Sequence, residues 1–185
     1  EHTGRAANDK FFVQEPSSQE NIARGKVNKG FAPEKFDALY SRVLAYIQGR
    51  NLYVQDCYAG ADNTHRLHIR VITETAWHSL FSRNLFIQIK DEEKLQSHNP
   101  GFTIISIPGF QAVPAIDGTN SEVFVIVDFG KKLVLIGGTS YAGEIKKSVF
   151  TILNYLLPSR DKVLPMHCSA NMDEDDNTAI FFGLS

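Results

Sequence analysis

Apolar and polar positions follow two different spacings along this chain, and each spacing predicts a different kind of secondary structure. Apolar residues recur at helical spacing in residues 32–49, 75–86 and 143–157. Short apolar runs typical of strands occupy residues 52–54, 67–72, 102–107, 122–129, 132–136, 163–168 and 178–182. The strands and helices do not alternate regularly. The pattern therefore predicts an α/β fold of the α+β kind, a mixed β-sheet flanked by helices, rather than a doubly wound sheet.

The stretch from Gly137 to Lys147 leads from a predicted buried strand through a glycine-rich turn into a helix. The first turn of a helix carries free N–H groups that attract anions. Apolar residues along the helix form a stripe, and Lys147 lies opposite its centre, toward solvent or a cleft. A functional lysine and a solvated pair with Lys146 both stay open on this pattern.

Composition and charge narrow the class of protein. A chain of 185 residues, 43% hydrophobic and 22% charged, is long and apolar enough for one folded domain and the start of another. Its net charge of −2 gives no basic excess for nucleic acid or an anionic membrane. No apolar run reaches the length of a membrane span, and two cysteines are too few for a disulfide framework. We therefore expect a reduced, cytoplasmic protein with no nucleic-acid or membrane partner.

The predicted strand at residues 163–168 ends in His167 and Cys168. A lone histidine in this setting is more often packed and hydrogen-bonded than a ligand. Cys168 has no second cysteine at ligand spacing, so we expect a buried structural thiol. The acidic turn Asp173–Asp176 lacks the spacing of a calcium loop and predicts a solvated hairpin tip.

A series of longer motifs runs in order along the chain. They are Thr3-Gly4-Arg5 with Asp9-Lys10, Tyr53-Val54-Gln55-Asp56, Arg70-Val71-Ile72-Thr73-Glu74, Ala76-Trp77-His78, Asp117-Gly118-Thr119-Asn120-Ser121-Glu122, Gly137 to Lys147, Asn154-Tyr155-Leu156-Leu157-Pro158, Met166-His167-Cys168-Ser169-Ala170-Asn171 and Phe181-Phe182-Gly183-Leu184-Ser185. Together they closely resemble the ATP-dependent phosphoenolpyruvate carboxykinase family. The resemblance covers essentially the whole chain.

The resemblance implies a reversible lyase reaction of gluconeogenesis, in which oxaloacetate and ATP give phosphoenolpyruvate, ADP and carbon dioxide. It implies that Arg5 holds the substrate carboxylate and the carbon dioxide end, and that Tyr141 lies along the substrate. Lys147 and His167 would be two protein ligands of Mn²⁺ near the γ-phosphate, with Mg²⁺ accompanying ATP. The third protein ligand of the family lies beyond this sequence.

The resemblance also implies a domain organisation. Residues 1–165 would form the substrate-side domain, and residues 166–185 would begin the nucleotide-binding domain. Gly183, Leu184 and Ser185 would open the loop around the ATP phosphates. Because Glu1 is not a methionine and the loop motif stops at Ser185, we expect a fragment that is inactive without the C-terminal domain of the same protein.

Two features qualify the resemblance. Ala6-Ala7-Asn8 stands where the family commonly has Ser-Pro-Lys, although Arg5 itself is present. Ile22-Ala23-Arg24-Gly25 stands where aromatic residues are usual. An alternative from another class is a stand-alone, non-catalytic binding or scaffold module that keeps the carboxykinase N-domain fold.

Overall fold

The computed structural model describes residues 2–183. The chain divides into two compact units, Glu1–Phe150 and Thr151–Ser185. The second unit contains the last part of a long helix and a two-stranded hairpin. The domain boundary expected after residue 165 stays a prediction.

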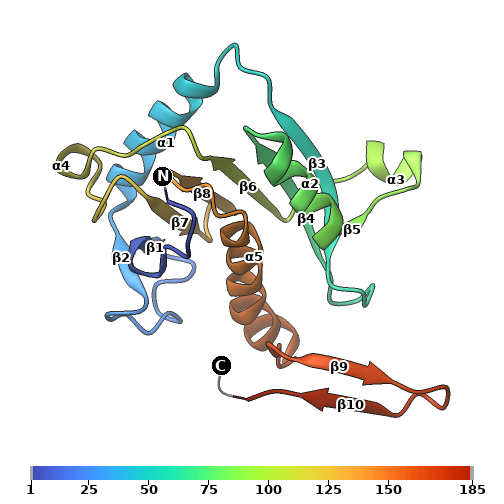
Figure 1. Cartoon of the computed structure of the whole chain (residues 1–185). Coiled ribbons are helices and arrows are strands. Elements are labelled where there is room, and N and C mark those ends of the chain that lie inside the picture. The colour runs from blue at the N-terminus through green and yellow to red at the C-terminus, as the bar shows by residue number, and fades with distance from the viewer. Residues whose placement is uncertain (1, 184–185) are drawn as a thin grey trace. The chain divides into compact units, whose positions relative to one another are not determined.

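Eight strands of the first unit, all within residues 2–183, form one sheet in the order β2-β1-β7-β8-β6-β4-β3-β5 (Figure 1). The strands are β1 (Lys10–Val13), β2 (Lys29–Phe31), β3 (Tyr53–Ala59), β4 (Leu67–Thr73), β5 (Ile87–Gln88), β6 (Phe102–Ile107), β7 (Phe124–Asp128) and β8 (Leu133–Gly137). β1 pairs in parallel with β2 and β7, and β6 pairs in parallel with β4 and β8. The pairs β7–β8, β3–β4 and β3–β5 are antiparallel, so the predicted mixed sheet is confirmed.

The helices are α1 (Pro33–Ile47), α2 (Ala76–Leu85), α3 (Glu92–Gln96), α4 (Pro114–Asp117) and α5 (Gly143–Leu156). Three of them, α1, α2 and α5, are the helices that the apolar spacing predicts. Pro33 lies in the first turn of α1, where the missing N–H group costs no helical hydrogen bond. Within residues 2–183, no helix combines the length and the apolar character that crossing a bilayer requires.

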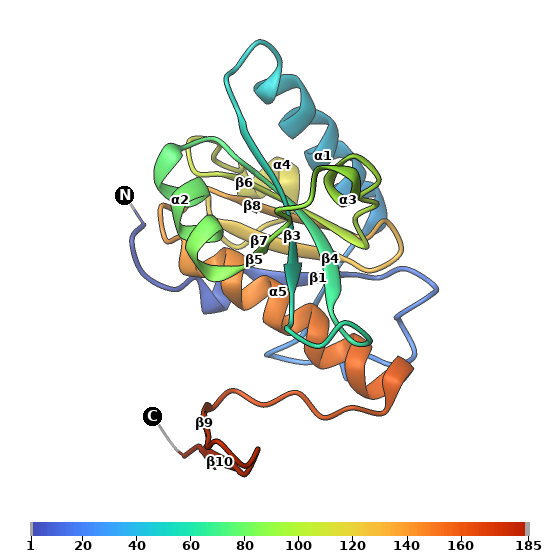
Figure 2. The same cartoon turned by 90° about the vertical axis from the view of Figure 1, so that its right-hand side faces the viewer.

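The core fills both faces of the sheet. On one face α1 buries Phe36, Leu39 and Val43 against apolar side chains of β1, β6, β7 and β8. The N-terminal half of α5 lies across the opposite face, with Ile145 and Val149 buried (Figure 2). Side chains alternate between the faces along a strand. Because Phe11 and Val13 of β1 join the α1 side, Lys10 and Phe12 lie on the face that α5 covers.

One strand predicted near the C-terminus is wrong. Residues 163–168 do not form a strand; β9 begins only at Ser169 and spans Ser169–Met172. Its antiparallel partner β10 (Thr178–Phe181) reaches its last pair at Phe181 and Ser169, so the earlier residues have no opposite strand. The helix predicted over residues 143–157 ends at Leu156, and a π-helical turn, Leu157–Asp161, follows it.

Candidate active site

The segment that carries Arg5 runs beside the turn between β8 and α5. His2 forms a β-bridge with Thr139, and the carbonyl oxygen of His2 accepts a hydrogen bond of 2.8 Å from Ser140 N. At the other end of the segment, Ser121 Oγ donates to Asp9 Oδ1 at 3.0 Å. Arg5 lies between these two anchors. Its side chain is exposed and makes no hydrogen bond or ion pair with the residues that the structure describes.

The glycine-rich turn from β8 into α5 follows the predicted path. Gly138 has a φ of +71°, and a Cβ there would collide with the carbonyl oxygen of Glu122. Only glycine takes this left-handed conformation without strain while it packs so closely against backbone. The turn ends where α5 begins, at Gly143. It places Ser140 and Tyr141 directly before the helix N-terminus.

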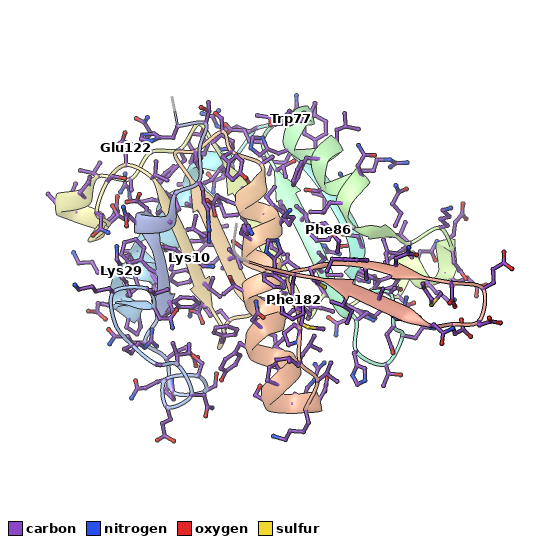
Figure 3. The ribbon with its side chains drawn as sticks, turned by 60° about the horizontal axis from the view of Figure 1, so that its bottom comes forward. Lys10, Lys29, Trp77, Phe86, Glu122 and Phe182 are labelled. Carbon is purple, nitrogen blue, oxygen red and sulfur yellow. The ribbon has the colours of Figure 1, made fainter. Side chains whose placement is uncertain are left out.

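A cavity of about 300 Å³ opens beside this turn. Tyr141 lies in its wall, so the structure brings this sequence-predicted residue to a concave surface. Trp77 and Phe81 contribute aromatic rings from α2, where Trp77 lies near the helix start (Figure 3). The remaining lining residues are Thr3, Ser140, Ala142, Gly143 and Lys146. Lys146, whose role the sequence leaves open, is exposed and faces this cavity.

A group of cations gathers next to the start of α5. The pKa of Lys10 is lowered to about 8, chiefly by burial and also by the positive charges of Arg5 and Lys147, while the attraction of Glu144 opposes the shift. Lys10 is the first residue of β1 (Figure 3). Its ammonium also lies 5.7 Å from the ring centroid of Phe12. Arg5, Lys10 and Lys147 therefore share one electrostatic environment, and such a site attracts anions.

Glu144 is the acidic member of this group. It is the second residue of α5 and only 3% exposed, and its Oε1 accepts a hydrogen bond of 2.8 Å from Ala6 N. A carboxylate in the first turn of a helix is stabilised by the helix dipole. The sequence alone assigns no role to Glu144, and Lys10 occurs only as one residue of a motif. Charge was the available sign of a shared site, because the two distant motifs that contain Arg5 and Lys147 each contain further charged residues.

His78 fixes α2 next to the same turn. Thr75 is the N-cap of α2, and its hydroxyl lies 2.6 Å from His78 Nδ1. Burial lowers the pKa of His78, while the backbone of Ser140 opposes that shift. Burial thus disfavours the charged form of this imidazole.

The other site residues predicted from the resemblance lie outside the first unit. His167 and Gly183 belong to the second unit, where both are exposed. Leu184 and Ser185 lie outside the described residues. Cys168 is exposed, so the expected buried thiol is wrong: within its unit the residue precedes a hairpin whose strand positions are all exposed. The buried thiol is Cys57, and burial, with Asp56 as a second cause, raises its pKa to about 12.

Comparison with known proteins shows the family of the chain. The profile of the phosphoenolpyruvate carboxykinase family matches residues 1–185. The chain belongs to this family. It is 65% identical to the phosphoenolpyruvate carboxykinase (ATP) of Pelobacter propionicus over 184 residues, which are all of this chain and 34% of that protein. The enzymes of the same name from Geotalea uraniireducens and Thermus thermophilus are 62% and 54% identical, again over the whole chain.

The chain spans about a third of the length of these curated relatives, 34–35% in each case. The carboxykinase fold class expected from the resemblance is thus confirmed, as is the family. In the structure, the family motifs at residues 3–10 and 137–147 meet at one place: the segment of Arg5, the start of β1 and the N-terminus of α5.

Proposed function

We propose that the protein to which this chain belongs converts oxaloacetate and ATP into phosphoenolpyruvate, ADP and carbon dioxide. The observation that carries the proposal is the electrostatic grouping of Arg5, Lys10 and Lys147, in the same unit where Tyr141 and Lys146 line a cavity at the start of α5. Oxaloacetate is a dianion, and both halves of its reaction generate negative charge. Fixed positive groups near a concave surface meet that demand.

Decarboxylation breaks one carbon–carbon bond. The electron pair moves into the enolate of pyruvate as carbon dioxide leaves, and the enolate oxygen then takes the γ-phosphoryl group while ADP departs. In this proposal Arg5 binds the substrate carboxylate, because a planar guanidinium can donate two parallel hydrogen bonds to it. The Tyr141 hydroxyl donates to the carboxylate that leaves as carbon dioxide.

The proposal assigns Lys147 and His167 as ligands of Mn²⁺, with Mg²⁺ bound to ATP. A lysine amine and an imidazole are both nitrogen donors that suit a transition metal once they are neutral. Lys147 is half-buried, and its positive charge acts on Lys10 beside it. A bound divalent cation would neutralise charge on the phosphoryl oxygens. Gly183, Leu184 and Ser185 would open the loop around the ATP phosphates, and residues 166–185 would begin the nucleotide-binding domain.

We also infer a cytoplasmic, gluconeogenic setting for the complete protein. The family reaction toward phosphoenolpyruvate serves gluconeogenesis. A cytoplasmic location is consistent with a chain whose two cysteines, Cys57 and Cys168, are both free thiols. The C-terminal domain of the same protein is the partner that the family organisation implies.

Turnover by the complete protein tests the proposal. Oxaloacetate and ATP should yield phosphoenolpyruvate and ADP in equal amounts. Arg5→Lys should lower kcat/KM for oxaloacetate about 100-fold, because an ammonium cannot replace a bidentate guanidinium. Arg83→Lys, an exposed change on α2, is the matched control and should leave kcat/KM unchanged. A complete protein that forms no phosphoenolpyruvate, or an Arg5→Lys variant with full activity, would contradict the proposal. Residues 1–185 alone should give no turnover.

A further inference from the structure

Glu144 joins two segments that lie far apart in the sequence. Its carboxylate extends from the second position of α5 to the backbone of Ala6, which directly follows Arg5. At 3% exposure it is screened from water, and a hydrogen bond from N–H to a buried carboxylate is stronger than one to a neutral acceptor. Glu144 also attracts the Lys10 ammonium. One buried carboxylate thus contacts residues 3–7, which we call the Arg5 loop, and attracts the charged Lys10 beside that loop.

The Arg5 loop has few other attachments. Among the residues described, Ala6 N to Glu144 Oε1 is the only hydrogen bond that joins residues 3–7 to a distant part of the chain, whereas Ala6 O accepts a local bond of 3.1 Å from Asp9 N. The next anchors lie outside the loop, at His2 on one side and at Asn8 and Asp9 on the other. Removing the Glu144 carboxylate would leave Arg5 in a segment held only at its two ends.

We propose that Glu144 is a positioning residue, which holds Arg5 in place for the substrate carboxylate through the Ala6 amide. This inference rests on the proposed function. Arg5 has no hydrogen bond or ion pair of its own within the described part of the chain, so its backbone must define its position. A guanidinium that is fixed before binding loses less conformational entropy when the carboxylate arrives. Glu144 therefore acts on substrate affinity without touching the substrate.

A double-mutant cycle in the complete enzyme tests this role. Glu144→Ala should raise KM for oxaloacetate about tenfold, the cost of about one charge-assisted hydrogen bond, with kcat changed less than about threefold. In an enzyme that already carries Arg5→Gln, Glu144→Ala should raise KM no further, because there is no guanidinium left to position. Additive effects of the two substitutions would overturn the inference, since they would show a structural role independent of Arg5.

Glu144→Gln provides the conservative comparison. Glutamine keeps an oxygen that can accept from Ala6 N, so it should recover at least about threefold of the KM lost in Glu144→Ala. Equal KM values for the two variants would overturn the role of the Ala6 hydrogen bond. Glu34→Ala removes an exposed carboxylate from the first turn of α1 and is the matched control, with KM unchanged.

Hydrogen exchange separates this inference from the proposed function. In the complete protein, Glu144→Ala should speed amide exchange in a peptide covering residues 3–9, and Glu34→Ala should not. This measurement requires no substrate. A protein that forms no phosphoenolpyruvate but shows faster exchange would refute the proposed function alone. Unchanged exchange at residues 3–9 would refute the tether in an otherwise active enzyme.

Discussion

The ring of Tyr141 lies directly against Gly143. A Cβ at position 143 would come within 2.6 Å of the Tyr141 hydroxyl oxygen and closer still to the ring carbon Cζ. No real side chain tolerates such a contact, so either the ring or the start of α5 would have to move. The absence of a side chain at residue 143 therefore determines where the phenol of Tyr141 points in the cavity wall.

Gly143→Ala should displace Tyr141 and raise KM for oxaloacetate in the complete enzyme by about tenfold, a loss comparable to one hydrogen bond. Gly4→Ala is the matched control, because a Cβ at Gly4 meets nothing within 4 Å, and it should leave KM unchanged. Steady-state kinetics with Tyr141→Phe as a reference measures the effect. A Gly143→Ala enzyme with the KM of the unmodified protein would show that the orientation of Tyr141 is unimportant.

Lys10 should titrate at a lower pH than an ordinary lysine. Its pKa of about 8, against 10.5 in the unfolded chain, means that the folded state holds fewer protons between these values. The free energy of unfolding should therefore rise with pH across this window, by no more than about 1.4 kcal/mol per pH unit. Below pH 8, Lys10 is protonated in both states and no longer makes the free energy of unfolding depend on pH. Lysine side-chain NMR measures the titration directly.

Lys10→Gln should remove the resonance that titrates near pH 8 and flatten the dependence of stability on pH between pH 8 and 10.5. Lys29→Gln, on the adjacent strand β2, is the control and should leave that resonance in place. A Lys10 resonance that titrates like that of an ordinary lysine would contradict this argument, because it would show that burial beside Arg5 and Lys147 does not destabilise the charged ammonium.

Lys147→Arg should abolish metal binding if Lys147 is a ligand. The amine must be neutral to coordinate a cation, whereas a guanidinium stays protonated in proteins. The Kd for Mn²⁺, measured by electron paramagnetic resonance on the complete protein, should rise on the order of 100-fold or more. Lys26→Arg, an exposed change, serves as the control. Equal Mn²⁺ affinity in both variants would remove Lys147 from the metal site.

Asp117 should be a major contributor to stability. Its carboxylate is buried, accepts from Arg42 Nη1 at 2.5 Å and also accepts from Val113 N at 2.6 Å. Asp117→Ala leaves both donors without this acceptor and should lower the free energy of unfolding by about 2–4 kcal/mol. Asp37→Ala breaks an exposed pair with Lys131 and should cost less than about 1 kcal/mol. Urea denaturation compares the two, and equal losses would contradict the argument.

Much of the fold could be predicted from the sequence. The helical spacing of Phe36, Leu39 and Val43 indicated α1 and its buried face. The apolar runs at residues 122–129 and 132–136 indicated β7 and β8. The short strand β1 was harder to predict, because Phe11 and Phe12 form an apolar run of only a few residues. Its place in the sheet depends on parallel pairing with β7, more than a hundred residues away.

Some residues of the candidate site could likewise be predicted from the sequence, and others could not. Arg5, Tyr141 and Lys147 were predicted from family motifs, and all three lie in the first unit. Tyr141 lines the cavity, whereas Arg5 and Lys147 belong to the group of cations around Lys10. The contribution of Glu144 could not be read from the sequence. A glutamate in the first turn of a helix is usually solvated, and burial with a contact to Ala6 arises only when the chain folds back.

The sequence by itself determined the family, the amphipathic helices, the glycine-rich turn and the residue types available for chemistry. These are local properties, set by spacing and by the side chains themselves. Only the tertiary structure decided that Lys10 shares an environment with Arg5 and Lys147, that Tyr141 packs on Gly143 and that Glu144 holds the Arg5 loop. Such relationships depend on burial and distance between remote segments, and those quantities exist only after the sheet has brought its strands together.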